Sequence, residues 1–492
     1  MAAPIPFDNS YARLPAMFHR PSPPVPVAAP RLALLNRSLA RELGIDPDWL
    51  ESPEGVQVLA GNTVPQGAEP VAMAYAGHQF GNFVPLLGDG RATLLGEVAS
   101  PALGRRDIHL KGCGRTPFSG QGDGRAPLGP MLREFIVSEG MAGLGIPTTR
   151  SLSVVATGEP VYRQTTQPGG LLARVAASHV RVGTFQYAAL FEDPAVLKAL
   201  ADHVIARHDP AAAEAPNPYL ALFEGVVARQ AVLVARWLLV GFVHGVMNTD
   251  NTSIAGETID YGPCAFIDAY DPAAVFSSID RHGRYAYANQ PTIAAWNLAR
   301  LAEALLPLLG PDQDAAIAAA QEKLSGFGPV FNAAYLGGMR RKLGLLAEQD
   351  GDLDLVRDLL ARMAANKADF TATFRRLCGA AEDEGADLSV RALFQDPAAF
   401  DGWAANWRQR LAREPAAAAD RAAAMRLANP AVIPRNHRVE EAIAAAVGND
   451  DFGPAERLVA ALAAPYEDRP EFAAYAEPPE PGQGVYRTFC GI

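Results

Sequence analysis

The stretch that decides the fold is HGVMNTDN, residues His244–Asn251, followed by the tripeptide DYG at Asp260–Gly262. It comes directly after a long segment, 219–242, whose apolar residues recur on all sides, so we expect a buried helix there. Asn and Asp carry the oxygen atoms that bind hard cations such as Mg²⁺, and such an ion neutralises phosphate groups. These residue types also favour ordinary turns. An ordered set of them after one buried helix nevertheless favours a site for metal and phosphate.

The order of these residues matches the catalytic signature of protein kinases, H-R-D-L-x-x-x-N followed by D-F-G. His244 aligns with the histidine, Asn251 with the asparagine and Asp260 with the aspartate of D-F-G. Val246 stands where kinases have their catalytic aspartate. Asp250 is the candidate replacement, because its carboxylate could take a proton from an incoming hydroxyl group. The sequence therefore predicts Asn251 and Asp260 as metal ligands and Asp250 as the catalytic base.

Four charged residues upstream complete the predicted site. Lys111 ends a β-like run, and Glu134 follows 23 residues later within a predicted helix, 130–144. Kinases place a strand lysine on the nucleotide phosphates and hold it with a glutamate from a nearby helix. Arg174 and Arg181 add guanidinium groups, whose geometry suits triphosphate oxygens. Each of these residues alone is typical of a surface ion pair. Together with the preceding motif they predict a phosphate site.

A glycine-rich segment precedes the predicted strand 93–98 and contains Gly88, Gly90 and Arg91. Glycine lets the backbone approach a phosphate closely. A dinucleotide-binding fingerprint would open a helix, and the sequence has no G-x-x-x-x-G-K-[ST] motif. We therefore expect a glycine-rich hairpin over a nucleotide. The polar run 114–125 is too long for a tight hairpin and is expected to be a functional loop.

The composition and residue pattern of the chain change twice. Between residues 74 and 275, dense glycines bound short β-like runs, which is typical of an antiparallel, hairpin-rich sheet. Later residues are rich in Ala, Leu and Arg with helical spacing. We predict an α+β, protein-kinase-like bilobal fold with an extended helical C-terminal half. Its regions are an N-terminal extension packed on the core (1–73), a nucleotide-binding and catalytic region (74–275) and a helical lobe (276–492). Expected strands are 93–98, 107–110, 151–156, 160–162 and 171–175, and expected helices are 30–43, 130–144, 219–242, 293–309, 314–324 and 352–365.

Composition limits the partners. The chain has 492 residues, 49% of them hydrophobic, and a formal net charge of −11. A nucleic-acid-binding protein needs a basic face, so nucleic acid is a poor partner. No run approaches about 18 uncharged apolar residues, and the first residues lack a basic stretch followed by an apolar one. We therefore expect no membrane span, no signal peptide, a cytoplasmic location and a monomer.

Taken together, these segments resemble the selenoprotein O family of kinase-like protein adenylyltransferases. The resemblance covers nearly the whole chain and implies transfer of AMP rather than of a phosphoryl group. It implies that ATP lies flipped relative to ordinary kinases, with its α-phosphate facing a Ser, Thr or Tyr hydroxyl of a protein substrate. It also implies ATP and Mg²⁺ as cofactors, with Mn²⁺ as an alternative metal. The matching runs are 7–11, 75–81, 87–98, 109–150, 241–272 and 429–438.

The same resemblance implies residue roles. Asp250 would be the catalytic base, Asn251 and Asp260 the Mg²⁺ ligands, and Glu134 the support for Lys111. Nucleotide contacts would come from Gly88, Gly90, Arg91, Lys111, Asp123, Gly124, Arg174, Arg181 and Asp260.

The four cysteines are Cys113, Cys264, Cys378 and Cys490, and no two form a C-x-x-C pair. Eukaryotic members of the resembling family carry a selenocysteine near the C-terminus, where this chain has Cys490. Cys264 lies four residues after Asp260. We hypothesise a reversible Cys264–Cys490 disulfide that makes the tail redox-capable and ties it over the metal-binding segment. The alternative is two unrelated thiols.

Two other functions fit the sequence. One is a protein kinase that transfers the γ-phosphate. The other is a catalytically inactive ATP-binding scaffold, which the valine at position 246 favours. Retention of Asn251, Asp260, Lys111 and Glu134 argues against a scaffold, since a scaffold has little need for a metal ion.

Overall fold

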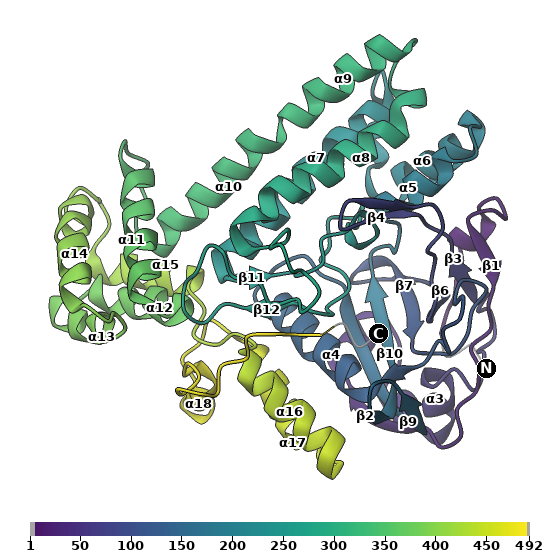
Figure 1. Cartoon of the computed structure of the whole chain (residues 1–492), viewed down its shortest axis with the longest axis horizontal. Coiled ribbons are helices and arrows are strands. Elements are labelled where there is room, and N and C mark those ends of the chain that lie inside the picture. The colour runs from purple at the N-terminus through teal and green to yellow at the C-terminus, as the bar shows by residue number, and fades with distance from the viewer. Residues whose placement is uncertain (1–4, 490–492) are drawn as a thin grey trace.

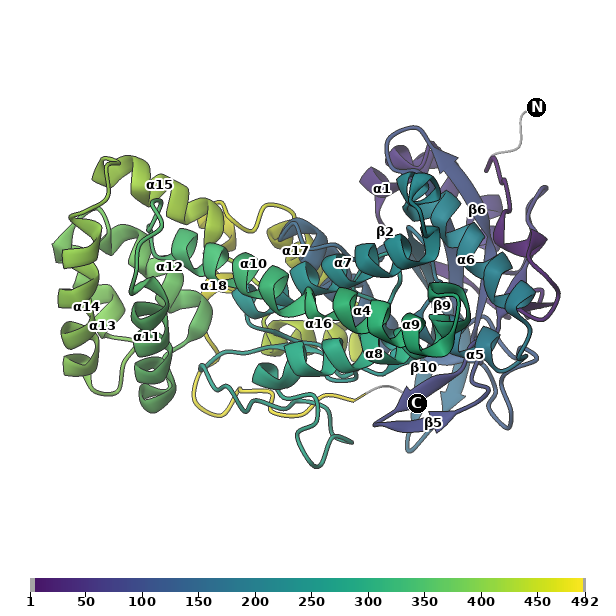
Figure 2. The ribbon, with the colours of Figure 1, turned by 90° about the horizontal axis from the view of Figure 1, so that it is seen from above.

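The computed structural model describes residues 5–489. A sheet lobe with its covering helices forms one side of the molecule, and a helical half extends away from it (Figure 1). Seen from above, the two parts lie side by side along the longest axis (Figure 2). The predicted mixed fold, with a sheet in the N-terminal part and helices in the C-terminal half, is confirmed.

The main sheet is antiparallel, as predicted, with strand order β1-β3-β6-β7-β10-β9-β2 and β8 paired to β10. The N-terminal 73 residues contribute three of its strands, so they are part of the sheet layer. The strands are β1 (His19–Pro21), β2 (Arg31–Leu35), β3 (Val71–Met73), β6 (Ala92–Ser100), β7 (Gly104–Lys111), β8 (Ala126–Pro127), β9 (Arg150–Tyr162) and β10 (Thr166–Ala176).

Two predictions in this lobe were wrong in detail. The segment 30–43 is not one helix, because its first half is strand β2, which pairs with β9. Asn36 then caps the short helix α1 (Arg37–Glu42) by accepting the backbone N–H of Leu39. The runs 151–156 and 160–162 belong to the single strand β9. Strand pairing overrides local helix propensity in the first case.

Helix α7 (Pro218–Val240) shows how the sequence sets the position of the central motif. Asn217 caps the helix by accepting the N–H groups of Tyr219 and Leu220. Gly241 ends it with a φ of +76°, a conformation that favours glycine. Residues 242 and 243 then form the short strand β11, which delivers His244–Asn251 to the edge of the sheet lobe. The motif is therefore anchored by a rigid element.

The predicted helices 130–144, 293–309, 314–324 and 352–365 are confirmed with small shifts at their ends. The structure also contains helices whose bounds were not predicted. The helices are α2 (Pro47–Glu51), α3 (Pro53–Leu59), α4 (Leu128–Gly143), α5 (Val182–Ala189), α6 (Pro194–His208), α8 (Gln290–Leu309), α9 (Gln313–Ser325), α10 (Phe327–Lys342), α11 (Asp352–Asn366), α12 (Phe370–Ala380), α13 (Asp387–Arg391), α14 (Pro397–Leu411), α15 (Ala418–Ala428), α16 (Asn436–Asn449), α17 (Gly453–Leu462) and α18 (Ala473–Ala476). The short strands are β4 (Gly77–Gln79), β5 (Asn82–Val84), β11 (Phe242–Val243) and β12 (Ala265–Phe266).

Two segments, Pro218–Val240 and Tyr287–Leu309, are long and apolar enough to cross a membrane by length and composition alone. Half of the most apolar window of each is buried inside the fold. Helices α7 and α8 also pack on one another within the largest hydrophobic core. Core helices of this kind meet the same criteria.

Candidate functional site

The predicted site residues come together. All of them except the two cysteines line one cavity of about 810 Å³ between the sheet and the segment 246–263. These residues are Gly88, Gly90, Arg91, Lys111, Asp123, Gly124, Glu134, Arg174, Arg181, Asp250, Asn251 and Asp260.

Strand pairing explains why the cations converge. Asp107, His109 and Lys111 alternate along β7, so their side chains lie on one face of the sheet. Arg174 on β10 is the register partner of His109, which brings it to the same face. Arg181 follows at the start of α5. Two neighbouring strands and one helix start therefore supply all three cations.

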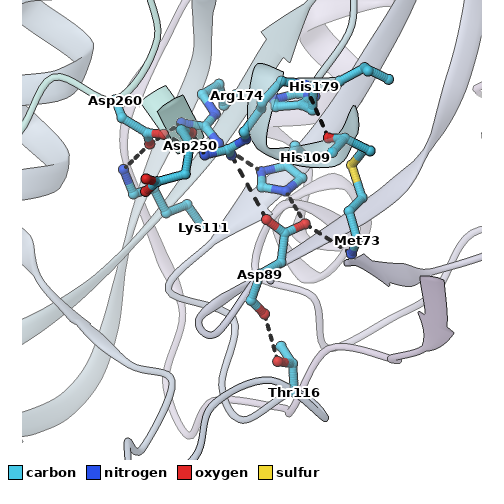
Figure 3. A network of polar contacts seen from close by, with 12 residues as sticks. Met73, Asp89, His109, Lys111, Thr116, Arg174, His179, Asp250 and Asp260 are labelled. Atoms are coloured by element: carbon cyan, nitrogen blue, oxygen red, sulfur yellow. Dashed lines mark hydrogen bonds and ion pairs between the residues drawn. The ribbon is translucent and has the colours of Figure 1, made fainter. Parts of the chain in front are cut away.

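The three cations meet at Asp260. Its Oδ1 lies 3.1 Å from Lys111 Nζ and 2.6 Å from Arg174 Nη1, and its Oδ2 lies 2.9 Å from Arg181 Nη1. Glu134 from α4 holds Lys111 at 2.6 Å and Arg174 at 3.2 Å. Figure 3 shows Lys111, Arg174 and Asp260 converging, with Asp250 beside them. Burial alone would raise the pKa of Asp260, but the three cations hold it well below its usual range.

A second buried layer orients these cations. Asp89 Oδ2 lies 3.1 Å from His109 Nε2 and can only accept, so Nε2 carries the proton and Nδ1 accepts from Arg174 Nη2 at 3.3 Å. Burial lowers the pKa of His109, an effect that Asp89 partly offsets. His179 stacks on His109 at a ring distance of 4.3 Å. The imidazole is therefore a neutral link that fixes the direction of Arg174.

Asp250 has a different environment. Its Oδ1 is buried and has no hydrogen-bond partner among residues 5–489. Burial raises the pKa of Asp250 to about 6, although Arg181 nearby opposes the shift. A Cβ atom at Gly77 would lie 2.5 Å from Oδ1, so a glycine is needed there. Asp250 as a residue lines the cavity, while its unpartnered Oδ1 is turned toward Gly77.

Asn251 and Asp260 suit a hard cation. The amide nitrogen of Asn251 donates to the Val246 carbonyl at 3.0 Å, which fixes its Oδ1 as an acceptor. In the part of the chain described here, no group of three or more His, Cys, Asp or Glu residues could hold a metal ion. Mg²⁺ commonly uses only one or two protein carboxylates together with substrate phosphates. The donor set of one amide oxygen and one carboxylate therefore fits Mg²⁺ in the presence of a nucleotide.

The predicted nucleotide loop lies at the rim of the cavity. A Cβ atom at Gly88, whose φ is +69°, would meet the ring of Phe118 at 2.4 Å. Asp123 is paired with Arg163 at 2.9 Å and is half exposed, so it does not join the cluster at Asp260. A Cβ atom at Gly124 would overlap the backbone of Gly114. These glycines allow two loops to pack closely over the cavity.

The predicted redox pair is only partly described. Cys264 is buried, and Cys490 lies outside the described residues. Thr488, two residues earlier, is buried and donates to the Pro263 carbonyl at 2.6 Å. The end of the described chain therefore lies beside the residue that precedes Cys264.

Sequence reasoning missed part of the site. The sequence did not single out Asp89, His109 or His179 as site residues. One signal could have found the histidine, because charged or polar residues at 107, 109 and 111 alternate with the apolar Ile108 and Leu110 at the end of the strand. Such a pattern on a buried strand indicates a polar face turned toward a site.

Comparison with known proteins agrees with the motifs. A family model described as protein adenylyltransferase SelO matches residues 3–463. Relatives named protein nucleotidyltransferase YdiU match over the full length of both chains, with 64% identity for one from Methylorubrum extorquens. The identity is 63% for relatives from Rhodopseudomonas palustris and from Bradyrhizobium diazoefficiens. The resemblance inferred from the motifs is therefore confirmed over nearly the whole chain.

Proposed function

This chain belongs to the protein adenylyltransferase SelO family, and from that premise we propose that it transfers AMP from ATP to Ser, Thr or Tyr hydroxyl groups of other proteins. We further propose that the sheet lobe and the helices after it form a protein-kinase-like bilobal fold. The observation that carries the proposal is the convergence of Lys111, Arg174 and Arg181 on one carboxylate inside the cavity.

The three cations would bind the phosphates of ATP. They now share Asp260, and Lys111 and Arg174 also pair with Glu134. A triphosphate has enough oxygen atoms to give each cation its own partner, and charge-assisted bonds of this kind are among the strongest in proteins. Glu134 would keep Lys111 and Arg174 in place while they change partners. Asp260 would then be available to a metal ion.

Mg²⁺ would be held by Asn251 and Asp260, and when bound it would neutralise phosphate charge. The glycine-rich segment at 88–91 and the loop with Asp123 and Gly124 would close over the nucleotide. His109 and Asp89 would hold Arg174 toward the phosphates. None of these residues needs to form a covalent bond.

Asp250 would accept the proton of the incoming hydroxyl group. The hydroxyl oxygen attacks the α-phosphorus and forms the new P–O bond, while the bond between the α-phosphorus and the bridging oxygen to the β-phosphate breaks. Pyrophosphate leaves with the electron pair of that bond, and the proton remains on Asp250. The position of Asp250 in the cavity wall and the rise of its pKa to about 6 on burial support this role.

The test compares two labels. The purified protein is incubated with Mg²⁺ and a bacterial lysate, in parallel with α-labelled and with γ-labelled ATP. We expect protein-bound label from α-labelled ATP only. Label from γ-labelled ATP would indicate a kinase, and ATP binding without any label would indicate an inactive scaffold, so either result would contradict the proposal.

A matched pair of variants assigns the activity to the site. Asp250→Asn should abolish transfer, because an amide cannot accept the proton at neutral pH. Asp202→Asn makes the same change on the exposed surface of α6, where Asp202 pairs only with Lys198 and Tyr219, and should retain wild-type transfer. Equal activity in both variants would contradict the assigned base.

We also propose that Cys264 and Cys490 form a reversible disulfide that regulates access to the site. The docking of Thr488 on Pro263 supports it, because it keeps the end of the described chain next to Cys264. Mass spectrometry of non-reduced peptides after mild oxidation should detect the linked pair. Two thiols that remain reduced under oxidant would contradict it.

A further inference from the structure

A short hairpin is fastened to the segment that carries Asp250. Strands β4 and β5 pair antiparallel. The N–H of His78 donates to Thr249 Oγ1 at 2.7 Å, and the N–H of Phe80 donates to Asn248 Oδ1 at 3.0 Å. Figure 1 shows β4 next to α5, and Figure 2 shows β5 projecting from the edge of the sheet lobe. One face of the hairpin is therefore fixed and the other is open.

The tip of this hairpin is strained. Phe80 has a φ of +49° and Gly81 a φ of +87°, so both central residues of the turn are left-handed. Asn, Asp and Gly are the usual residues in such turns, and a phenylalanine there is a costly choice. The ring of Phe80 lies 5.1 Å from that of Tyr285 and lines the cavity. Strain of this kind at the edge of a site indicates a function for the side chain.

The loop 279–285 continues the same surface. Asp280 is buried and accepts the N–H groups of Arg284 and Tyr285, which shapes the loop. The hydroxyl of Tyr285 donates to Asn248 Oδ1 at 2.6 Å. The loop is therefore fastened to the same residue as the hairpin. Ile279 from this loop lines the cavity.

The open face is apolar and cationic. Phe83, Leu86 and Ile279 are 42%, 51% and 55% exposed, and exposed apolar side chains that gather on one surface mark interaction sites. Arg284 lies over the ring of Trp296 at 4.9 Å. Within residues 5–489, the guanidinium groups of Arg281 and Arg284 form no ion pair with a carboxylate, although the backbone N–H of Arg284 donates to Asp280.

The charge of this face differs from that of the chain. The protein carries a net charge of −11, yet Arg281 and Arg284 belong to the loop 279–285, whose Ile279 lines the same cavity as Asp250, and neither forms an ion pair with a carboxylate in the described chain. The face therefore attracts an acidic partner while most of the surface repels one. The apolar side chains of this face add surface area that such a partner can bury.

We infer that this face, defined by Phe80, Phe83, Leu86, Ile279, Arg281 and Arg284, binds the acceptor protein and selects a segment with acidic and apolar residues around the acceptor hydroxyl. The inference rests on the proposed function. It places the acceptor on the side of the cavity that Asp250 occupies. Arg281 binds the acidic residues of the segment, and Phe83 packs against its apolar side chains.

The test uses two synthetic peptides with the same central Thr and Tyr, one flanked by Asp and Glu and the other by Lys. Transfer from α-labelled ATP is measured at several peptide concentrations. We expect a KM about tenfold lower for the acidic peptide. Arg281→Glu should reverse this preference, while Arg357→Glu, the same charge change on the exposed surface of α11, should leave it unchanged.

A second variant tests the apolar part. Phe83→Ser should raise the KM for the acidic peptide with kcat and ATP affinity unchanged, because Phe83 is exposed and does not line the cavity. Equal use of both peptides by the wild type, or an unchanged preference in Arg281→Glu, would overturn the inference while the proposed function stands. A wild type that labels neither the peptides nor lysate proteins would overturn the proposed function itself.

Discussion

Two of the buried clusters of arginines and carboxylates invite comparison, one in the sheet lobe around Asp260 and one in the helical half around Asp352. In the helical half, Arg340 and Arg410 each bind one oxygen of Asp352, at 2.8 and 2.7 Å. Glu414 accepts from Arg410 and from the backbone of residues 346 and 347. Every carboxylate oxygen in this cluster has its own partner.

The cluster in the sheet lobe is not fully satisfied in this way. Three cations share Asp260, and Oδ1 of the neighbouring Asp250 has no partner in the described chain. Real proteins break the rules of polar satisfaction mainly at functional sites. The comparison teaches that the matched cluster holds the fold together, while the unmatched cluster is arranged for a ligand.

The largest effect should come from Asp260→Ala. Loss of this carboxylate removes one proposed metal ligand, and we expect transfer of AMP to fall by about a thousandfold or more. The rate is measured with α-labelled ATP at saturating Mg²⁺. If the variant retained a tenth of the wild-type rate, the cluster around Asp260 would not be arranged for catalysis.

Asp352→Asn, in the cluster of the helical half, should lower stability and leave activity unchanged. Breaking a buried ion pair leaves the partner charges uncompensated, so we expect the free energy of unfolding to fall by about 3–5 kcal/mol. Urea unfolding measures this loss. The value of kcat/KM per folded molecule should not change, and a specific loss of transfer would show that this cluster is not purely structural.

Gly77→Ala should have a smaller effect on transfer. The added methyl group would lie 2.5 Å from Asp250 Oδ1 and push the carboxylate aside. A misplacement of about 1 Å can reduce catalysis up to about a hundredfold, and we expect a loss of ten- to a hundredfold in kcat. Gly328→Ala in α10 is the control, because its Cβ atom would contact nothing within 4 Å. Equal rates for both variants would contradict the position of Asp250.

The smallest effect should come from Lys342→Met in the helical half. Lys342 is buried over the rings of Phe370 and Phe374, and burial lowers its pKa to about 7. The unfolded chain binds this proton up to a pH of about 10, so the wild-type stability should rise with pH between about 7 and 10. The variant should be more stable than the wild type by about 1 kcal/mol at pH 7. Its stability should not rise between pH 7 and 10. An unchanged pH dependence of unfolding would show that Lys342 stays charged.

The sequence was sufficient for elements whose signals are local. The apolar residues on all sides of 219–242 predicted the buried helix, and the order of the residues 244–262 predicted the motif after it. The same reasoning brought Lys111 and Glu134 together correctly, at 2.6 Å. It failed at β2, where pairing with β9 decides the structure, and it did not find Asp89, because the contact with His109 exists only after β7 and the preceding loop pack together.

The most direct test of the account is a crystal structure with Mg²⁺ and a non-hydrolysable ATP analogue. We expect the phosphates within hydrogen-bond distance of Lys111, Arg174 and Arg181, with Asp260 and Asn251 facing the metal ion. The present contacts of Asp260 with the three cations should then be replaced at least in part. A nucleotide bound outside the cavity, with these contacts unchanged, would contradict the account.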